Sequence, residues 1–208
     1  MGKTLSVFAC LALGACFAPA QELKPIQLPA PRTEGGMPLM QALKERHSTR
    51  QFSSQTLSPQ TLSNLLWAGF GINRPDGHRT APSAMNWQEV DIYVATPSGV
   101  YVYDAKANAL QPVVEGDLRA VTGVQPFVKD AAVDLVYVAD TARTRPNELE
   151  TSALDTGFIA QNVYLFCASE GLAAVVRGSV DKAAVAKAFM LRPEQRVLLA
   201  QSVVYPEK

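Results

Sequence analysis

Residues 46–50 carry side chains whose types and spacing could bind a phosphate group. The segment reads Arg-His-Ser-Thr-Arg, so Ser48 lies between the guanidiniums of Arg46 and Arg50. Each guanidinium offers a planar fork of donors to phosphate oxygens, and the serine hydroxyl adds a short neutral donor. A solvated helix end would also explain these arginines, because clusters of charge on a helix usually face solvent.

Residues 82–88 form a second polar segment, with the sequence Pro-Ser-Ala-Met-Asn-Trp-Gln. Its hydroxyl and amide groups suit the hydrogen-bonding edge of a flat heterocycle, although Asn86 and Gln88 could equally bond within a turn or at a strand edge. Together the two segments indicate a phosphorylated cofactor with a ring system, for which flavin mononucleotide (FMN) is the best candidate. No metal site is predicted, because the chain has only 2 histidines, in unrelated contexts.

Residues 1–20 have the pattern of a secretory signal peptide. Lys3 is followed by an apolar run over residues 5–13 and by the small-residue cleavage pattern Ala-Pro-Ala at 18–20. The sequence Leu-Gly-Ala-Cys ending at Cys16 also resembles a lipobox, which gives a competing prediction of a lipoprotein anchored there. We therefore expect a periplasmic or secreted protein, with membrane attachment only through Cys16. The formal net charge of zero argues against nucleic-acid binding.

The rest of the chain is predicted to form an extended arm over residues 21–37 and one domain over residues 38–208. Prolines and glycines without hydrophobic periodicity mark the arm. Ser58-Pro59 is a helix start, and Gly69, Gly71 and Gly171 are helix stops. Patterns predict helices over 38–45, 59–69, 149–170 and 181–190, and strands over 90–94, 99–103, 135–139, 173–176 and 197–204. This order predicts an α+β fold with a largely antiparallel sheet.

These motifs, in this order, resemble the nitroreductase family of FMN-dependent proteins. Residues 46–50 are similar to the family's phosphate motif, and residues 80–88 to its Pro-Ser-x-x-Asn-x-Gln stretch. Residues 160–165 resemble the central helix, which is followed by Gly171-Leu172 and then by Arg177-Gly178 at the flavin-facing turn. Residues 65–69 and 99–104 look closest to the SagB-type dehydrogenase branch.

The resemblance implies a nitroreductase-like fold, a central mainly antiparallel sheet with helices packed on it, and a homodimer with FMN sites between the subunits. Arg46, Ser48 and Arg50 of one subunit would hold the phosphate. The isoalloxazine contacts would come from the other subunit, through Pro82, Ser83, Ala84 and Asn86. Gly178 would place a backbone N–H near flavin N5, where a glycine permits close approach. Arg177, beside it, would bind an anionic ligand or form a surface ion pair.

The implied function is that of an exported FMN-dependent oxidoreductase. A donor would reduce the flavin and a small electrophile, such as a nitro compound or a quinone, would reoxidise it in a ping-pong cycle. The flavin carries this chemistry, so no catalytic side chain is expected. Two alternatives stay open: a flavin-binding module without turnover, and a SagB-type peptide azoline dehydrogenase. Lys208 or Arg196 would have to replace the basic C-terminal residues of other family members.

Overall fold

A seven-stranded antiparallel sheet organises the computed structural model, which describes residues 23–207. The predicted leader, residues 1–20, lies outside the described residues. The strand order is β1-β4-β3-β2-β5-β7-β6, and each neighbouring pair is antiparallel. The strands are β1 (Ile26–Gln27), β2 (Val90–Ala95), β3 (Gly99–Asp104), β4 (Ala109–Glu115), β5 (Val133–Asp140), β6 (Ala173–Arg177) and β7 (Gln195–Val204).

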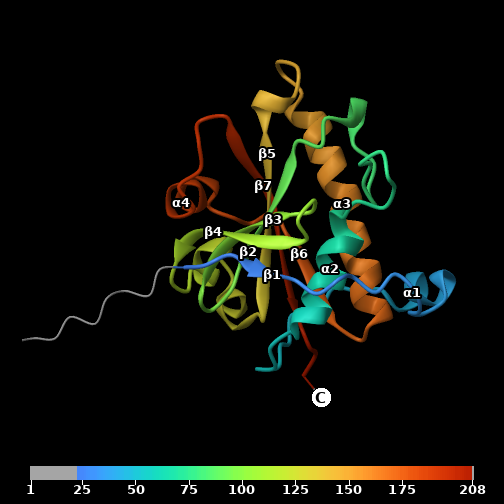
Figure 1. Ribbon diagram of the computed structural model, residues 1–208. Coiled ribbons are helices and arrows are strands. Elements are labelled where there is room, and N and C mark those ends of the chain that lie inside the picture. Colours follow the sequence, from blue (N-terminus) through green and yellow to red (C-terminus); the bar gives the residue numbers. More distant parts are fainter. Residues whose placement is uncertain (1–22, 208) are drawn as a thin grey trace, which may run out of the picture.

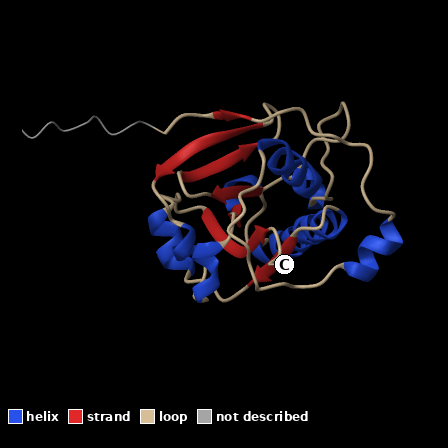
Figure 2. Ribbon diagram, turned by 90° about the horizontal axis from the view of Figure 1, so that it is seen from below, coloured by secondary structure: helices blue, strands red, loops and turns tan. Residues whose placement is uncertain are grey.

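Helices cover both faces of this sheet (Figure 1). Helices α2 and α3 pack on one face, and α4 lies on the other with the 3₁₀ turns η2 (Arg119–Thr122) and η3 (Pro126–Asp130). Helix α1 lies at one edge of the molecule against α3, and Figure 2 also shows it at the edge. The α-helices are α1 (Leu39–Glu45), α2 (Pro59–Phe70), α3 (Leu149–Ser169) and α4 (Lys182–Ala188). The predicted α+β architecture is confirmed.

Strand β5 is the most deeply buried part of the sheet. It lies between β2 and β7, and all 8 of its residues are buried. A continuous apolar run in the sequence predicted burial on both faces, because a strand with one exposed face alternates apolar and polar residues. Tyr137 from this strand and Gln201 from β7 share a buried hydrogen bond of 2.5 Å from the tyrosine hydroxyl. This bond satisfies two polar groups that have no access to water.

Local signals explain where the long helices begin and end. The Thr61 N–H donates to Ser58 Oγ at 3.0 Å, so Ser58 caps α2 as predicted, with a proline in the first turn. Gly171 follows α3 with φ +67°, a left-handed conformation that favours glycine. Gly69, in contrast, was wrongly predicted as a stop. It lies inside α2, where an added Cβ would come within 3.0 Å of Val163, and therefore lets α2 approach α3 closely.

The N-terminal arm lies along the sheet and over α2. Strand β1 within it pairs with β4, a strand that the sequence analysis missed because Pro112 interrupts its pattern. Further along the arm, the Arg32 N–H donates to Asn64 Oδ1 at 2.8 Å. Among the described residues, no helix combines the length and apolarity that a membrane crossing requires.

Candidate functional site

The segment of residues 46–50 lies along the outer edge of β6. Strand β6 ends the sheet, so the backbone groups on its outer side need partners from outside the sheet. The Thr49 N–H supplies one by donating to the Ala174 carbonyl at 3.0 Å. Further along the chain, the Ser53 N–H donates to the Tyr205 carbonyl at 3.1 Å, so the segment after residue 50 lies beside the C-terminal tail. These contacts fix the backbone that carries Arg46, Ser48 and Arg50.

Tyr164 on α3 is the side chain around which this segment is arranged. Its hydroxyl oxygen accepts from the Val176 N–H at 2.7 Å and lies 2.8 Å from Ser48 Oγ. A tyrosine hydroxyl has a single hydrogen, which it can give to Ser48 Oγ, and the Ser48 hydrogen is then free to meet a ligand. The Arg46 guanidinium lies over the Tyr164 ring, 5.2 Å from its centroid, which holds the cation by a cation–π contact.

The guanidinium groups of Arg46 and Arg50 are not used in ion pairs within the described protein. Arg46 is half-buried and Arg50 is exposed, and no ion pair found between residues 23 and 207 involves either guanidinium. The neighbouring cavity has a volume of about 170 Å³ and is lined by His47, Thr49 and Tyr164 among others. Two available cations with a hydroxyl between them fit a phosphate monoester. Arg46 and Ser48 therefore meet at Tyr164, and Arg50 is exposed two residues further along the chain.

Residues 82–88 form a strained loop that ends at the start of β2. Met85, Asn86 and Gln88 have φ of +52°, +55° and +49°, a region that non-glycine residues rarely adopt. Such backbone persists only where surrounding contacts hold it, and it gathers at ligand-binding sites. Here the Gln88 N–H donates to Ser83 Oγ at 2.8 Å, and the Ser83 hydroxyl donates to Glu89 Oε2 at 3.1 Å.

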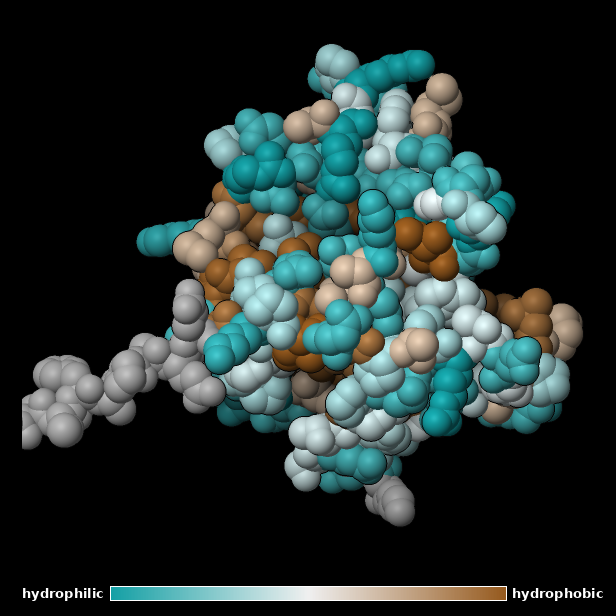
Figure 3. Space-filling view, in the orientation of Figure 1, coloured by the Kyte–Doolittle hydropathy of each residue, from teal (hydrophilic) through white to brown (hydrophobic). Residues whose placement is uncertain are grey.

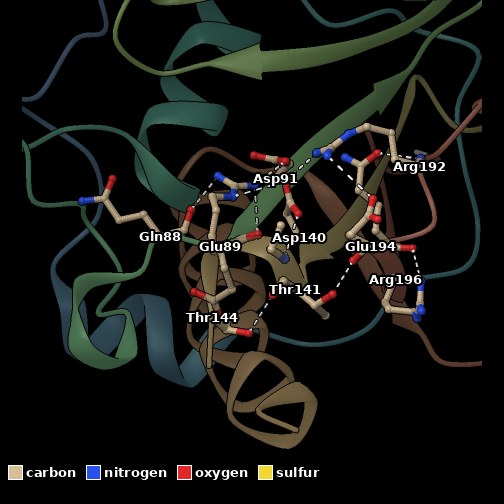
Figure 4. A network of polar contacts seen from close by, with 12 residues as sticks. Gln88, Glu89, Asp91, Asp140, Thr141, Thr144, Arg192, Glu194 and Arg196 are labelled. Atoms are coloured by element: carbon tan, nitrogen blue, oxygen red, sulfur yellow. Dashed lines mark hydrogen bonds and ion pairs between the residues drawn. The ribbon is translucent and has the colours of Figure 1, made fainter. Parts of the chain in front are cut away.

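Helix α3 and the turn after β5 hold the two ends of this loop. The Ala84 N–H donates to Asp155 Oδ2 on α3 at 2.8 Å. At the other end, Arg143 donates to the carbonyls of Gln88 and Glu89 at 2.9 and 3.0 Å. Arg143 also pairs with Asp91 at 2.5 Å. Asp91 and Asp140 lie side by side in the polar network that Figure 4 shows.

The Gln88 amide is used within the protein, whereas the start of the loop is open to solvent. Gln88 Nε2 donates to Asn86 Oδ1 and to the Gly77 carbonyl, at 2.8 and 3.0 Å, and Gln88 Oε1 accepts from Arg79. Pro82 and Asn86 are exposed, and Ser83 and Ala84 are partly exposed. Pro82, Ser83, Ala84 and Asn86 therefore form the solvent-facing part of the loop, and Gln88 supports it from within.

The two segments lie on opposite sides of α3 within one chain. Asp155 holds the loop and Tyr164 holds the arginine segment, and two and a half helical turns separate them. That spacing turns the two side chains about 180° apart around the axis and places them about 14 Å apart along it. Between them, α3 presents Leu154 and Phe158 to solvent, with 64% and 48% of each exposed. One chain alone does not bring the two groups of predicted site residues together.

Arg177 does not lie where the sequence analysis placed it. Its side chain is only 2% exposed and pairs with Asp134 at 2.8 Å. It also donates to the Thr122 carbonyl at 2.7 Å, so it lies on the η2 face of the sheet, away from α3. The surface role expected for Arg177 is replaced by a buried ion pair. Burial raises the pKa of Asp134 to about 7 and lowers the pKa of Arg177.

Gly178 follows Arg177 at the exposed end of β6, two residues after the backbone N–H that binds Tyr164. An added Cβ there would meet only Leu199, at 4.0 Å. No internal contact of the described protein therefore requires a glycine at this position. The open space is compatible with a flat ligand lying against the backbone.

The structure also describes Cys167 and Arg196, two residues that the sequence analysis singled out. Cys167 is a buried free thiol, and burial raises its pKa far above the ordinary value, so it packs as a small hydrophobe as predicted. The Arg196 guanidinium bonds to the carbonyls of Pro193 and Gln195, and Lys208 lies outside the described residues. Among residues 23–207, no group of histidine, cysteine or acidic side chains could hold a metal ion.

Sequence reasoning missed the residues that support the site: Tyr164, Glu89, Asp155 and Arg143. Asp155 carried a usable signal, because it falls on the buried stripe of α3 with Ser152 and Ile159. A carboxylate at such a position needs a partner from another element. Arg143 carried no such signal, since the groups of the loop that it holds are backbone carbonyls.

Comparisons with known proteins bear on the fold and the family of the chain. A model described as the nitroreductase family matches residues 43–205. A nitroreductase-like protein of Methanocaldococcus jannaschii is 28% identical over 155 residues, which is 68% of this chain and 78% of that protein. A crystal structure of a nitroreductase-like protein from Ralstonia eutropha has a TM-score of 0.86 at 42% identity, and covers 92% of this chain and 93% of that one.

A further crystal structure, from Desulfovibrio desulfuricans, is of a nitroreductase-like protein in complex with FMN. It has a TM-score of 0.62 at 23% identity, and covers 84% of this chain and 89% of that one. At this level of identity the likeness shows the fold alone. The described residues thus have the nitroreductase-like fold.

Proposed function

Since the chain belongs to the nitroreductase family, we propose that it is an oxidoreductase that binds FMN as its cofactor. The observation that carries the proposal is the arrangement of Arg46 and Ser48 around Tyr164, beside an exposed Arg50. This donor set matches a phosphate monoester, which is the terminal group of FMN. The FMN complex of the Desulfovibrio relative supports the choice of cofactor.

Each part of the site has a role in this proposal. Bound FMN supplies hydride acceptance and donation at N5. Arg46, Ser48 and Arg50 bind the phosphate, and the exposed polar groups of residues 82–86 bind the ring edge. Gly178 leaves room for the ring system against the backbone. The protein's share is to bind and orient, which needs no side-chain acid or base.

We propose a homodimer as the state that completes the site. The stripe of Leu154 and Phe158 on α3 lies between the two segments, and α1 exposes Leu39, Met40 and Leu43. The apolar colour at the right-hand edge of Figure 3, over α1, marks the second of these surfaces. Exposed apolar surfaces of this kind indicate a protein partner. Two-fold pairing across α3 would bring residues 82–88 of one protomer next to residues 46–50 of the other.

Phe158→Asp tests this pairing. A charge at the centre of the apolar stripe should shift the protein from dimer to monomer in analytical ultracentrifugation. FMN binding should fall with dimerisation, because each site would need both protomers. Glu150→Gln, on an exposed carboxylate of the same helix, serves as the control and should stay dimeric. A monomeric Phe158→Asp protein that binds FMN with wild-type affinity would contradict the shared site.

The cofactor is tested by the colour of the purified protein and by its affinity for FMN. We expect flavin absorbance, and release of FMN on denaturation. Arg46→Ala should raise the Kd for FMN by about tenfold or more, the scale of one charge-assisted hydrogen bond. Arg145→Ala, another exposed arginine, should leave Kd unchanged. A colourless protein that excess FMN cannot reconstitute would refute the proposal.

Turnover assays separate the proposed reaction from its alternatives. We propose a ping-pong cycle in which a donor reduces the flavin and a nitro compound or quinone reoxidises it. A flavin-binding module would pass electrons to these acceptors no faster than free FMN does. A SagB-type dehydrogenase would instead require an azoline-containing peptide. Stopped-flow reoxidation of the reduced protein by each acceptor class measures the difference directly.

We also propose export through the signal peptide of residues 1–20, to the periplasm or beyond. The N-terminal mass of the mature protein distinguishes cleavage after Ala20 from lipidation at Cys16. A cytoplasmic protein that retains Met1 would contradict export in either form.

A further inference from the structure

The hydroxyl group of Tyr164 joins the segment of residues 46–50 to strand β6. Its oxygen accepts from the Val176 N–H at 2.7 Å and lies 2.8 Å from Ser48 Oγ. The Val176 N–H points outward from the last strand of the sheet, where a further strand would supply a carbonyl as its acceptor. The tyrosine hydroxyl therefore takes the place of a backbone acceptor, and the Ser48 side chain is its second partner.

The direction of the bond between Tyr164 and Ser48 decides what Ser48 can offer to a ligand. Within residues 23–207 neither hydroxyl has a further partner. If Tyr164 donates its single hydrogen to Ser48 Oγ, the Ser48 hydrogen is free to be donated to a ligand. The reverse direction would use the Ser48 hydrogen on the tyrosine and leave only lone pairs for the ligand. A negatively charged ligand therefore requires the first direction.

The Tyr164 ring makes a contact that is separate from those of its hydroxyl. The Arg46 guanidinium lies 5.2 Å from the ring centroid, at the distance of a cation–π contact. Among the residues that the structure describes, no acidic side chain pairs with Arg46. Replacing Tyr164 by phenylalanine would keep the ring beneath Arg46 and remove only the hydroxyl. The two contributions of this side chain can therefore be measured separately.

We propose that Tyr164 is a positioning residue that holds Ser48 as a hydrogen-bond donor and thereby makes the site select FMN over riboflavin. The proposal rests on the proposed function. Riboflavin has the same ring system and ribityl chain as FMN, but it ends in a hydroxyl instead of a phosphate. That hydroxyl can either donate or accept, so it does not require Ser48 as a donor. The phosphate offers charged acceptor oxygens, and it does require one.

Tyr164→Phe tests the proposal through the affinities for the two flavins. The Kd for FMN should rise by about tenfold, the scale of one hydrogen bond to a charged group, whereas the Kd for riboflavin should change by less than about twofold. Tyr103→Phe is the control, because its hydroxyl bonds to Asn108 at 3.3 Å on β3, far from β6 in the strand order. It should leave both affinities unchanged. An equal loss of affinity for both flavins in Tyr164→Phe would overturn the proposal, since a general disturbance of the fold would weaken both.

A double-mutant cycle tests whether Tyr164 acts through Ser48. Ser48→Ala removes the donor itself and should raise the Kd for FMN by about tenfold as well. Adding Tyr164→Phe to Ser48→Ala should then raise the Kd by less than about twofold more, because there is no serine left to position. Residues that act independently would instead multiply their losses in the double variant. Such a result would overturn the proposed role of Tyr164.

Inorganic phosphate serves as a probe that needs no flavin. Because a ligand that binds the folded state raises its Tm, phosphate should raise the Tm of the flavin-free wild type above its value in chloride at the same ionic strength. The rise should be smaller in Tyr164→Phe. If no flavin binds to the wild type but this difference is found, the role of Tyr164 stands and the proposed cofactor fails. If no flavin binds and the response to phosphate is absent, or equal in the two proteins, the inference fails as well.

Discussion

Replacing Arg177 by methionine tests whether this buried arginine supports the fold rather than the ligand. The substitution keeps an unbranched, apolar side chain of similar reach. It removes the partner of Asp134 at 2.8 Å and the donor to the Thr122 carbonyl at 2.7 Å. Asp134 retains its hydrogen bond from Ser202 but no cation. The variant therefore leaves a carboxyl group in a site with no exposed surface.

The loss in free energy of unfolding follows from the groups that the substitution leaves without a partner. Removing one partner of a buried ion pair costs about 3–5 kcal/mol, because the remaining charge is uncompensated. The pair is not strongly stabilising as a whole, since burial raises the pKa of Asp134 to about 7 despite the guanidinium. The double variant Arg177→Met with Asp134→Val should therefore lose less than Arg177→Met alone. Its residual loss should be about 1–3 kcal/mol for the unpaired Thr122 carbonyl.

The pH dependence has a definite sign. Folded Asp134 holds its proton up to about pH 7, whereas an unfolded aspartate releases it near about pH 4. The folded state binds more protons over this window, so the contribution of Asp134 to the free energy of unfolding falls as pH rises through it. In Arg177→Met the carboxylate has no cation, and the penalty should be larger at pH 8 than at pH 5.

Urea unfolding followed by circular dichroism measures these free energies for the wild type, both single variants and the double variant. A cost below about 1 kcal/mol for Arg177→Met, or a double variant that loses the sum of the single losses, would refute the account. FMN binding then tests whether Arg177 also contacts the ligand. In the folded Arg177→Met protein the Kd for FMN should stay within about threefold of wild type. A loss of affinity for FMN of about tenfold, the scale of one charged contact, would indicate that Arg177 does contact the ligand.

Three further predictions concern single positions. Ser58→Ala removes the cap of α2 and should lower the free energy of unfolding by about 1 kcal/mol in urea titrations. Gly123→Ala should be much worse, with about 3 kcal/mol or more lost and a lower Tm, because the added Cβ would lie 1.8 Å from Arg177 Nη1. Gly178→Val should leave the Tm unchanged, since only Leu199 is near, while the Kd for FMN rises by about tenfold or more if a ring lies against this backbone. Unchanged FMN binding by folded Gly178→Val would remove Gly178 from the site.

The sequence predicted those elements whose signals are local. The Ser58-Pro59 start, the apolar run of β5 and the glycine after α3 each specify structure within a few residues, and each was found. Strand β4 was missed because Pro112 interrupts its pattern, although its partner β3 comes just before it in the chain. Gly69 was misassigned for a different reason, because its packing against Val163 is a tertiary contact that the local sequence does not show.

The sequence allowed prediction of the charged and turn-forming residues of the candidate site. It did not allow prediction of the residues that hold them in place. Arg46 and Ser48 were recognised from their chemistry, but Tyr164, which orders them, was hidden in a helix of ordinary composition. Arg177 was expected near the surface because it precedes the glycine of the flavin-facing turn. Its partner Asp134 lies on a strand whose other residues are mostly apolar, so a single carboxylate there did not reveal the pair.

The location of residues 46–50 has a consequence for the solubility of the protein. At the far edge of the sheet, β1 covers part of β4, and at the near edge this arginine segment shields β6 through Thr49. An uncovered outer strand is a template on which another molecule can add its own strand. Release of the segment would thus expose a surface that favours self-association. An anion bound to the arginines of residues 46–50 would hold the segment in place, and would thereby also protect the protein from aggregation.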